Sequence, residues 1–236
     1  MAYTIPPPTS LLEPAGMHIP DGFVSAPLAA AGYVAAGIIV AVAIRQTNRR
    51  FGERQAPLMG MMAAFIFAAQ MMNFPVAGGT SGHMLGAALA TILLGPWAAM
   101  IVLTCVVGVQ ALVFQDGGLA ALGANVFNMA VIGVSVSYVV YRIARALAGS
   151  NPRLVYASAF VAAWFSMEAA ALACSFELAT SGTSPLHVVV PAMVGVHALI
   201  GIGEGLITVA ALAFITATRS DLLLLQTREG VRFETE

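Results

Sequence analysis

The sequence contains no lysine, and its ten basic residues are all arginines. Without lysine the chain cannot carry a Gly-x-x-x-x-Gly-Lys-[Ser/Thr] loop, so it does not hydrolyse nucleotides through that motif. A seven-helix retinal protein is excluded as well, because it needs a Schiff-base lysine. Two common hydrolase motifs, His-Glu-x-x-His and Gly-x-Ser-x-Gly, are also missing. Any ATP-driven work must therefore come from a partner protein.

Charged residues are also scarce. They make up 9% of the 236 residues, whereas 59% are hydrophobic, and a soluble domain has roughly 25% charged residues. The net charge of -1 gives no support for a nucleic-acid partner. Both cysteines, Cys105 and Cys174, lie in apolar runs, which favours free buried thiols over a disulfide. The sequence therefore predicts an integral membrane protein in contact with the lipid bilayer.

The apolar runs have the length of helices, and Gly, Pro and Arg clusters separate them, which favours α-helices over a β-barrel. We expect an all-α bundle of seven transmembrane helices at about residues 27–44, 56–72, 83–94, 96–114, 119–147, 154–180 and 186–218. A Gly-rich loop precedes the third helix, and Gly95-Pro96 separates the third from the fourth. The third helix would rise only about 18 Å, short of a hydrocarbon core of about 30 Å.

The arginines support seven spans. With that number, the arginines of residues 45–54, 142–153 and 219–232 all fall on one side of the membrane. The positive-inside tendency then places the N-terminus outside and the C-terminus in the cytoplasm, as in a multi-pass protein of a prokaryotic inner membrane. His18, His83 and His187 would all lie at the outer face.

The first 16 residues contain four prolines, no basic start and no long apolar core, so they do not resemble a signal peptide. We expect three parts: a disordered or non-native leader at 1–16, the transmembrane domain at 17–218 and a cytoplasmic tail at 219–236. On this hypothesis Met17 is the true start of the protein.

Polar residues in and between the helices are the candidates for chemistry. Those expected at the outer face are His18, Asp21, Gln70, Asn73, Ser81, His83, Gln115, Asp116, Asn125, Asn128 and His187. Each also has an ordinary structural explanation, since Asp-Gly pairs form turns and buried amides bridge helices. Ionisable groups inside a span are costlier and mark function or a specific partner; these are Glu168, His197 and Glu204. His197 and Glu204 share a helix face and could form a structural buried pair or part of a proton or ion path.

A metal site would use the histidines, because imidazole nitrogen suits nickel, cobalt, copper and zinc. If Met17 is the first residue, its amine, the amide nitrogen of His18 and the Nδ1 atom of His18 can chelate one ion. His83 would complete a plane of four nitrogens, which favours Ni(II) or Cu(II) over tetrahedral Zn(II). Nearby polar side chains are possible outer-layer partners of these ligands: Ser81, Gln115, Asp116, Asn125 and Asn128.

Several motifs resemble the CbiM/NikM family, the substrate-binding membrane components of energy-coupling-factor (ECF) transporters for cobalt or nickel. The resemblance covers about residues 17–215, and its motifs are Met17-His18-Ile19-Pro20-Asp21-Gly22, Gly79-Thr80-Ser81-Gly82-His83, Leu94-Gly95-Pro96-Trp97, Phe114-Gln115-Asp116-Gly117-Gly118, the run from Leu122 to Met129 and the run from Val196 to Glu204.

This resemblance implies a non-enzymatic seven-helix subunit that transports Ni(2+) or Co(2+), with an N-terminal segment plugged into the bundle from outside. The ion ligands it implies are Met17, His18 and His83. The partners it implies are a transmembrane coupling subunit, a pair of cytoplasmic ATPases and a small accessory membrane subunit. Small residues at four-residue spacing would suit the coupling subunit or internal packing equally well: Gly32, Ala36, Ala64 and Ala68.

Two other functions stay open from the residues alone. A proton- or cation-coupled secondary carrier would use Glu168, His197 and Glu204, although such carriers often contain internal repeats and none is evident here. An intramembrane enzyme would use His197 and Glu204 as acid and base but lacks a nucleophile or metal motif. Planar nitrogen ligation favours nickel, while the outer motifs suit nickel and cobalt alike.

Overall fold

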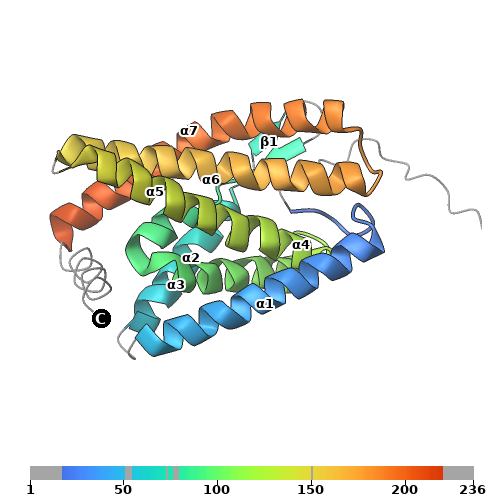
Figure 1. Cartoon of the computed structure of the whole chain (residues 1–236), viewed down its shortest axis with the longest axis horizontal. Helices are drawn as coiled ribbons and strands as arrows, with labels where there is room; N and C mark the ends of the chain where they lie inside the picture. The colour runs from blue at the N-terminus through green and yellow to red at the C-terminus, as the bar shows by residue number, and fades with distance from the viewer. Residues whose placement is uncertain (1–17, 51–54, 73, 77–79, 150, 220–236) are drawn as a thin grey trace, which may run out of the picture.

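The computed structural model describes residues 18–50, 55–72, 74–76, 80–149 and 151–219. The predicted leader, Met17, Asn73 and residues 220–236 of the predicted tail lie outside these residues. The described chain forms a helical bundle in which α6 and α7 run side by side and α1 borders the opposite edge (Figure 1).

Helices account for nearly all of this structure. The elements in chain order are α1 (Ala26–Arg50), α2 (Ala56–Gln70), β1 (Phe74–Val76), β2 (Thr80–Gly82), α3 (Ala87–Val109), the π-helical turn η2 (Gln110–Phe114), α4 (Leu122–Val126), the π-helical turn η3 (Phe127–Gly133), α5 (Val134–Ala148), α6 (Pro152–Thr180) and α7 (Leu186–Thr218). The prediction of an α-helical membrane protein is confirmed. Strands β1 and β2 pair antiparallel where a plain Gly-rich loop was expected, so that detail of the prediction was wrong.

Five helical stretches of the described residues are long and apolar enough to cross a membrane: Ala26–Arg49, Ala87–Phe114, Leu122–Ala148, Arg153–Thr180 and Leu186–Thr218. Seven separate helices were expected. The difference has two causes: α2 has only 15 residues, and the predicted third and fourth helices form the single element α3 with η2. The predicted third helix also begins too early, because His83 to Gly86 are not helical and the helix starts at Ala87.

Gly95 interrupts α3 with a φ of 76° and a ψ of 165°, a conformation outside the helical region. An unbroken helix over Ala87–Phe114 would be about 42 Å long. Yet His83, just before this stretch, and Asp116, just after it, both lie against His18. The chain therefore reverses direction at Gly95-Pro96, so the break predicted there is real although the flanking helices are assigned to one element.

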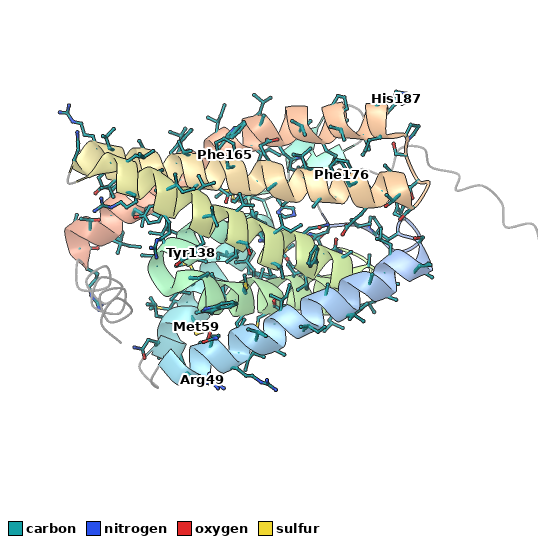
Figure 2. The ribbon with its side chains drawn as sticks, viewed as in Figure 1. Arg49, Met59, Tyr138, Phe165, Phe176 and His187 are labelled. Atoms are coloured by element: carbon teal, nitrogen blue, oxygen red, sulfur yellow. The ribbon has the colours of Figure 1, made fainter. Side chains whose placement is uncertain are left out.

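The bundle has two chemically different ends. The loops that meet at one end carry His18, His83, Asp116 and Ser181, and the backbone N–H of Ser25 donates to Ser181 Oγ there. The arginines of the described residues lie toward the other end, and Arg49 and His187 mark the two ends in Figure 2. Helix α1 carries Arg45 and Arg49 on its last turns, where the sequence had predicted a loop.

Glycines allow α1 and α4 to approach closely. A Cβ atom on Gly32 would lie 2.8 Å from the Ala124 backbone nitrogen, and one on Gly123 would lie 2.3 Å from the Tyr33 nitrogen. Because backbone cannot move aside as a side-chain end can, neither position has room for a larger residue. This contact brings the start of α4, and with it Asn125, against the N-terminal segment.

Candidate ion-binding site

Two histidines stack inside the bundle. The ring centroids of His18 and His83 lie 4.6 Å apart, with an angle of 24° between the planes. Their exposed fractions are only 4% and 2%. The two residues come from segments 65 positions apart in the sequence (83 minus 18), so only the tertiary structure brings them together.

Hydrogen bonds to backbone hold the segment that carries His18. Asn125 forms two hydrogen bonds with Ile19, the residue after His18. Ile19 N–H donates to Asn125 Oδ1 at 2.8 Å, and Asn125 Nδ2 donates to the Ile19 carbonyl at 3.1 Å. Gly118 N–H donates to the same carbonyl at 2.9 Å. Asp21 Oδ1 accepts from Ala120 N–H at 2.7 Å. The chain around His18 is thus docked in the bundle like a bound peptide, with Ile19 buried.

His83 lies in the extended segment between β2 and α3. Its Nδ1 atom lies 2.8 Å from the Met84 carbonyl, and because a carbonyl only accepts, Nδ1 carries the proton and Nε2 has the free lone pair. Burial, helped by the nearby His18, lowers the pKa of His83 to about 3. The ring is therefore neutral at physiological pH and presents Nε2 in the form that binds metal ions.

Asp116 completes the group around His18. Its Oδ1 atom lies 3.2 Å from His18 Nδ1, an ion-pair distance at which the two groups are not aligned as a hydrogen bond. The contact with His18 lowers the pKa of Asp116, and burial opposes this only in part. Gln115 places Asp116 here, since its left-handed backbone (φ 55°) turns the chain at the end of η2.

Four side-chain atoms of this group are buried and have no hydrogen-bond partner among the described residues. They are His18 Nδ1, His18 Nε2, His83 Nε2 and Asp116 Oδ2. Buried polar groups normally find partners, so such a cluster points to a ligand. Its two imidazoles are of the ligand type that suits nickel, copper and zinc, although the described residues contain no group of three or more His, Cys, Asp or Glu side chains placed to hold a metal ion.

The predicted outer-layer residues divide into three groups. Asn125 contacts the His18 segment and Asp116 contacts His18 itself, as described above. Asn128 instead donates from Nδ2 to Glu177 Oε2 at 2.6 Å, and the Gln115 side chain is exposed. Ser81 belongs to β2, but its side chain lies outside the description. His187, expected at this face, is exposed at the start of α7.

Sequence reasoning missed two residues, Glu177 and Gln110. Glu177 on α6 supports Asn128, and Gln110 is completely buried one turn before Asp116. Either could have been found as a polar side chain near the end of an apolar run, the signal that identified Gln70 and Asn73.

The deeper ionisable residues do not form the pair that the sequence suggested. His197 Nδ1 lies 2.6 Å from the Met193 carbonyl of its own helix. Glu204 accepts hydrogen bonds from the backbone of Leu85 and Gly86. Glu168 is buried, and neither of its oxygens has a partner among the described residues. Shared position on one face of α7 did not predict the partners, because His197 bonds within its own helix and Glu204 bonds to the backbone of the segment beside α7.

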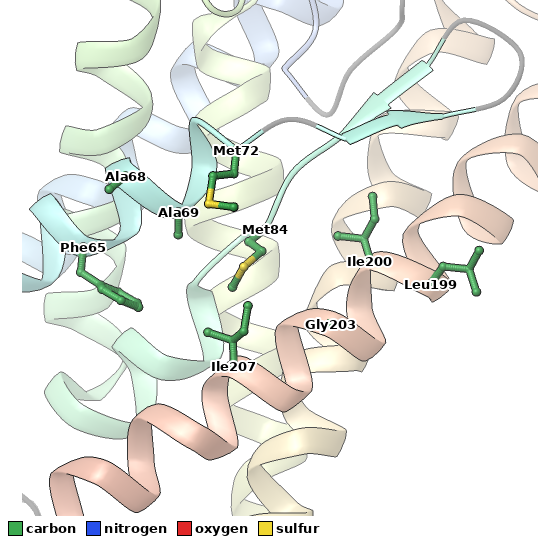
Figure 3. Close-up of a pocket in the computed structure, with 9 residues that line it drawn as sticks. All are labelled: Phe65, Ala68, Ala69, Met72, Met84, Leu199, Ile200, Gly203 and Ile207. Carbon is green, nitrogen blue, oxygen red and sulfur yellow. The ribbon is translucent and has the colours of Figure 1, made fainter.

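An apolar pocket of about 550 Å³ lies between α2 and α7, beside the segment that carries Met84 (Figure 3). Met84 faces it, flanked by Phe65 and Met72 on one side and Ile200 and Ile207 on the other. None of the described residues that line it is charged, so the histidine pair is the better candidate for an ion site.

Comparison with known proteins gives a consistent set of relatives. A family model described as "cobalt uptake substrate-specific transmembrane region" matches residues 18–222. The chain is 40% identical to a putative metal transport protein of Haloquadratum walsbyi, covering 89% of this chain and 94% of that protein. It is 43% identical to a putative fused nickel transport protein NikMN of Archaeoglobus fulgidus, covering 88% and 68%. A crystal structure of a transition metal transporter superposes with a TM-score of 0.79 at 35% identity, covering 91% and 99%.

Proposed function

The chain belongs to the CbiM family of membrane proteins of cobalt and nickel transport, and from this membership we propose that it is the ion-binding subunit of an ATP-driven ECF-type importer. Its substrate is Ni(2+) or Co(2+), taken up from the outer face and passed on with the help of separate subunits. The observation that carries the proposal is the buried stack of His18 and His83, whose Nε2 atoms have no hydrogen-bond partner among the described residues.

The proposed ligands are Met17, His18 and His83. With a free amine on Met17, that amine, the His18 amide nitrogen and His18 Nδ1 form fused chelate rings, and His83 Nε2 closes a four-nitrogen plane. In the described structure His18 Nδ1 faces Asp116 at 3.2 Å, so the ion would take the place of this contact. Such a plane favours nickel, and we propose Ni(2+) as the first ion to test and Co(2+) as the second.

This chelate requires Met17 to be the mature start. The N-terminal mass of the protein purified from its native host tests this, with a chain that begins at Met17 as the expected result. A mature chain that begins at residue 1 or 2 would exclude the amine ligand and with it the four-nitrogen plane.

The membrane arrangement we propose has seven crossing segments, with the histidine end outside and the arginine end in the cytoplasm. Two observations support the number: α2 is apolar from Ala56 to Ala69, and the reversal at Gly95 lets His83–Leu94 and Pro96–Phe114 cross in opposite directions. The gathering of arginines at one end supports the orientation.

The proposed partners are a transmembrane coupling subunit, an ATPase pair and a small accessory membrane subunit. The fused NikMN relative, of which this chain covers 68%, supports a further membrane component. The small residues singled out in the sequence divide between two surfaces: Gly32 and Ala36 pack inside the bundle, whereas Ala64 and Ala68 on α2 are exposed. The exposed pair on α2 is therefore where we place the contact with the coupling subunit.

Calorimetry of the purified protein with Ni(2+) and Co(2+) tests the function. Wild-type protein should bind at micromolar concentration or below, and His18→Ala and His83→Ala should each remove this binding while the protein stays folded in the membrane. His187→Ala is the matched control, because this exposed histidine lies at the same end but outside the site. Absence of Ni(2+) and Co(2+) binding by the wild-type protein would refute the proposal.

A further inference from the structure

A fully buried carboxylate holds the extended segment that carries His83. Glu204 Oε2 accepts from Leu85 N–H at 2.7 Å, and Glu204 Oε1 accepts from Gly86 N–H at 3.0 Å. From the other side, Gln70 Nε2 donates to the Leu85 carbonyl at 2.8 Å. The segment is thus fixed between α7 and α2 by side chains whose exposed fraction is 0%.

The start of α3 explains why a carboxylate is tolerated at this depth. Gly86 is the residue before the first turn of α3; its left-handed backbone (φ 77°) favours glycine, and a Cβ atom there would lie 2.8 Å from the Ile66 side chain. The first N–H groups of a helix lack partners within it and carry partial positive charge. Glu204, which belongs to α7, accepts hydrogen bonds from two N–H groups at this point and so caps the start of α3 from another helix.

The link to His83 passes through one peptide group. The Met84 carbonyl, which accepts from His83 Nδ1 at 2.8 Å, and the Leu85 N–H, which Glu204 holds, belong to the same peptide plane. Since a peptide group is planar, fixing its N–H end also fixes the direction of its carbonyl end. Glu204 therefore controls the group that sets the ring orientation and the proton position of His83.

We propose that Glu204 is a positioning residue for the ion ligand His83. It holds the Met84–Leu85 peptide so that the carbonyl keeps the proton on Nδ1 and leaves Nε2 directed at the ion. This is the arrangement of a carboxylate behind a metal-binding histidine, with a peptide group inserted between the two. The inference rests on the proposed ion-binding function and adds a residue that never touches the ion.

Ni(2+) titration of the full-length protein tests this role. Glu204→Ala should weaken Ni(2+) binding by roughly 10- to 100-fold, the usual effect of removing an outer partner of a ligand. At saturating Ni(2+), its absorption band should move toward that of His83→Ala, because a misdirected His83 no longer coordinates. Glu204→Gln keeps one acceptor oxygen, so its affinity should be intermediate and its band that of the wild type.

Glu168→Ala and Glu168→Gln are the matched controls. Glu168 is a buried carboxyl on α6 whose oxygens have no partner among the described residues, so both variants should keep wild-type Ni(2+) affinity and spectrum. If Glu204→Ala fails to fold, the Ni(2+) affinity of Glu204→Gln becomes the test. A Glu204→Gln affinity equal to that of Glu168→Gln would refute the positioning role.

Two further outcomes overturn the inference. Wild-type affinity in Glu204→Ala would show that His83 needs no such support. A weakened Glu204→Ala whose saturated spectrum stays that of the wild type would show that Glu204 supports only the fold. A wild-type protein that binds no Ni(2+) or Co(2+) would instead refute the ion-binding function itself, and this inference would fall with it.

Discussion

At the scale of single residues, hydrogen bonds between side chains and backbone groups hold the candidate site in place. Asn125 binds both the N–H and the carbonyl of Ile19, so one amide side chain fixes the residue next to His18. A backbone group orients the second imidazole, since the Met84 carbonyl accepts from His83 Nδ1. These hydrogen bonds do not involve the proposed ligand atoms, His18 Nδ1 and His83 Nε2, although His18 Nδ1 lies 3.2 Å from Asp116 Oδ1 and an ion would have to replace this contact.

Asn125→Ala should weaken both the site and the fold. It removes two buried hydrogen bonds and leaves the Ile19 N–H without this partner, so we expect a loss of about 2 kcal/mol in stability. Ni(2+) affinity should fall roughly 10-fold or more, because the His18 segment is held less firmly. Thermal unfolding and calorimetry measure the two effects.

Asn128→Ala is the matched control for this substitution. Asn128 lies one turn away but bonds to Glu177 and not to the His18 segment. It should therefore lose stability without a comparable loss of ion affinity. Equal losses of affinity in the two variants would contradict the specific role of Asn125.

At the scale of elements, the reversal at Gly95 shapes the site most. It brings the start of α3 and the end of η2 to the same end of the bundle, so that His83 and Asp116 approach His18 from different segments. Glycine is required there by its backbone, since its φ of 76° lies in a region that other residues rarely adopt.

Gly95→Ala should destabilise the protein by about 1–3 kcal/mol, the cost of holding a residue with a side chain in such a conformation. A Cβ atom there would meet no neighbour within 4 Å, so the whole effect would come from the backbone. Gly108→Ala is the control: it lies in the helical part of α3 and is equally uncrowded. It should be neutral or gain up to about 1 kcal/mol, and equal destabilisation of both variants in thermal unfolding would contradict this account.

The elements also show what the sequence could predict. Apolar runs and Gly-Pro breaks were sufficient for the helices and for the interruption at Gly95, because these features are local. Three features were not local. Helix α1 continues through Arg45 and Arg49, residues that were assigned to a loop because they are charged. The histidine at 83 lies in extended chain, and Glu204 bonds to that chain and not to His197.

The site could be predicted in part for the same reason. The motifs around His18 and His83 predicted two imidazoles that the structure stacks together and an amide, Asn125, that bonds to the residue after His18; that they hold an ion stays a prediction. They could not identify the partners of Glu204 or Glu177, because those depend on which backbone groups are left unpaired beside α7 and α6 after folding.

At the scale of the whole molecule, the two ends differ in charge. Polar loops with the histidine site form one end, and arginines gather toward the other, a distribution that orients membrane proteins during insertion. The site is also built from widely separated parts of the chain, so it exists only in the folded bundle.

Cysteine labelling in intact cells tests the proposed orientation. In a background of Cys105→Ala and Cys174→Ala, Ser184→Cys in the loop before α7 should react with a membrane-impermeant maleimide. Ala146→Cys, exposed near the arginine end of α5, should react only after the membrane is permeabilised. The reverse pattern would place the histidine end in the cytoplasm.

The docked segment around His18 has a consequence for affinity. It behaves as an intramolecular peptide ligand whose receptor is the rest of the bundle, joined to it by the short link from Gly22 to α1. Only the docked fraction presents both imidazoles together, so the apparent dissociation constant for the ion is the intrinsic constant divided by that fraction. If the ion is held by the proposed ligands, any change that undocks this segment releases the ion and leaves every ligand residue unaltered.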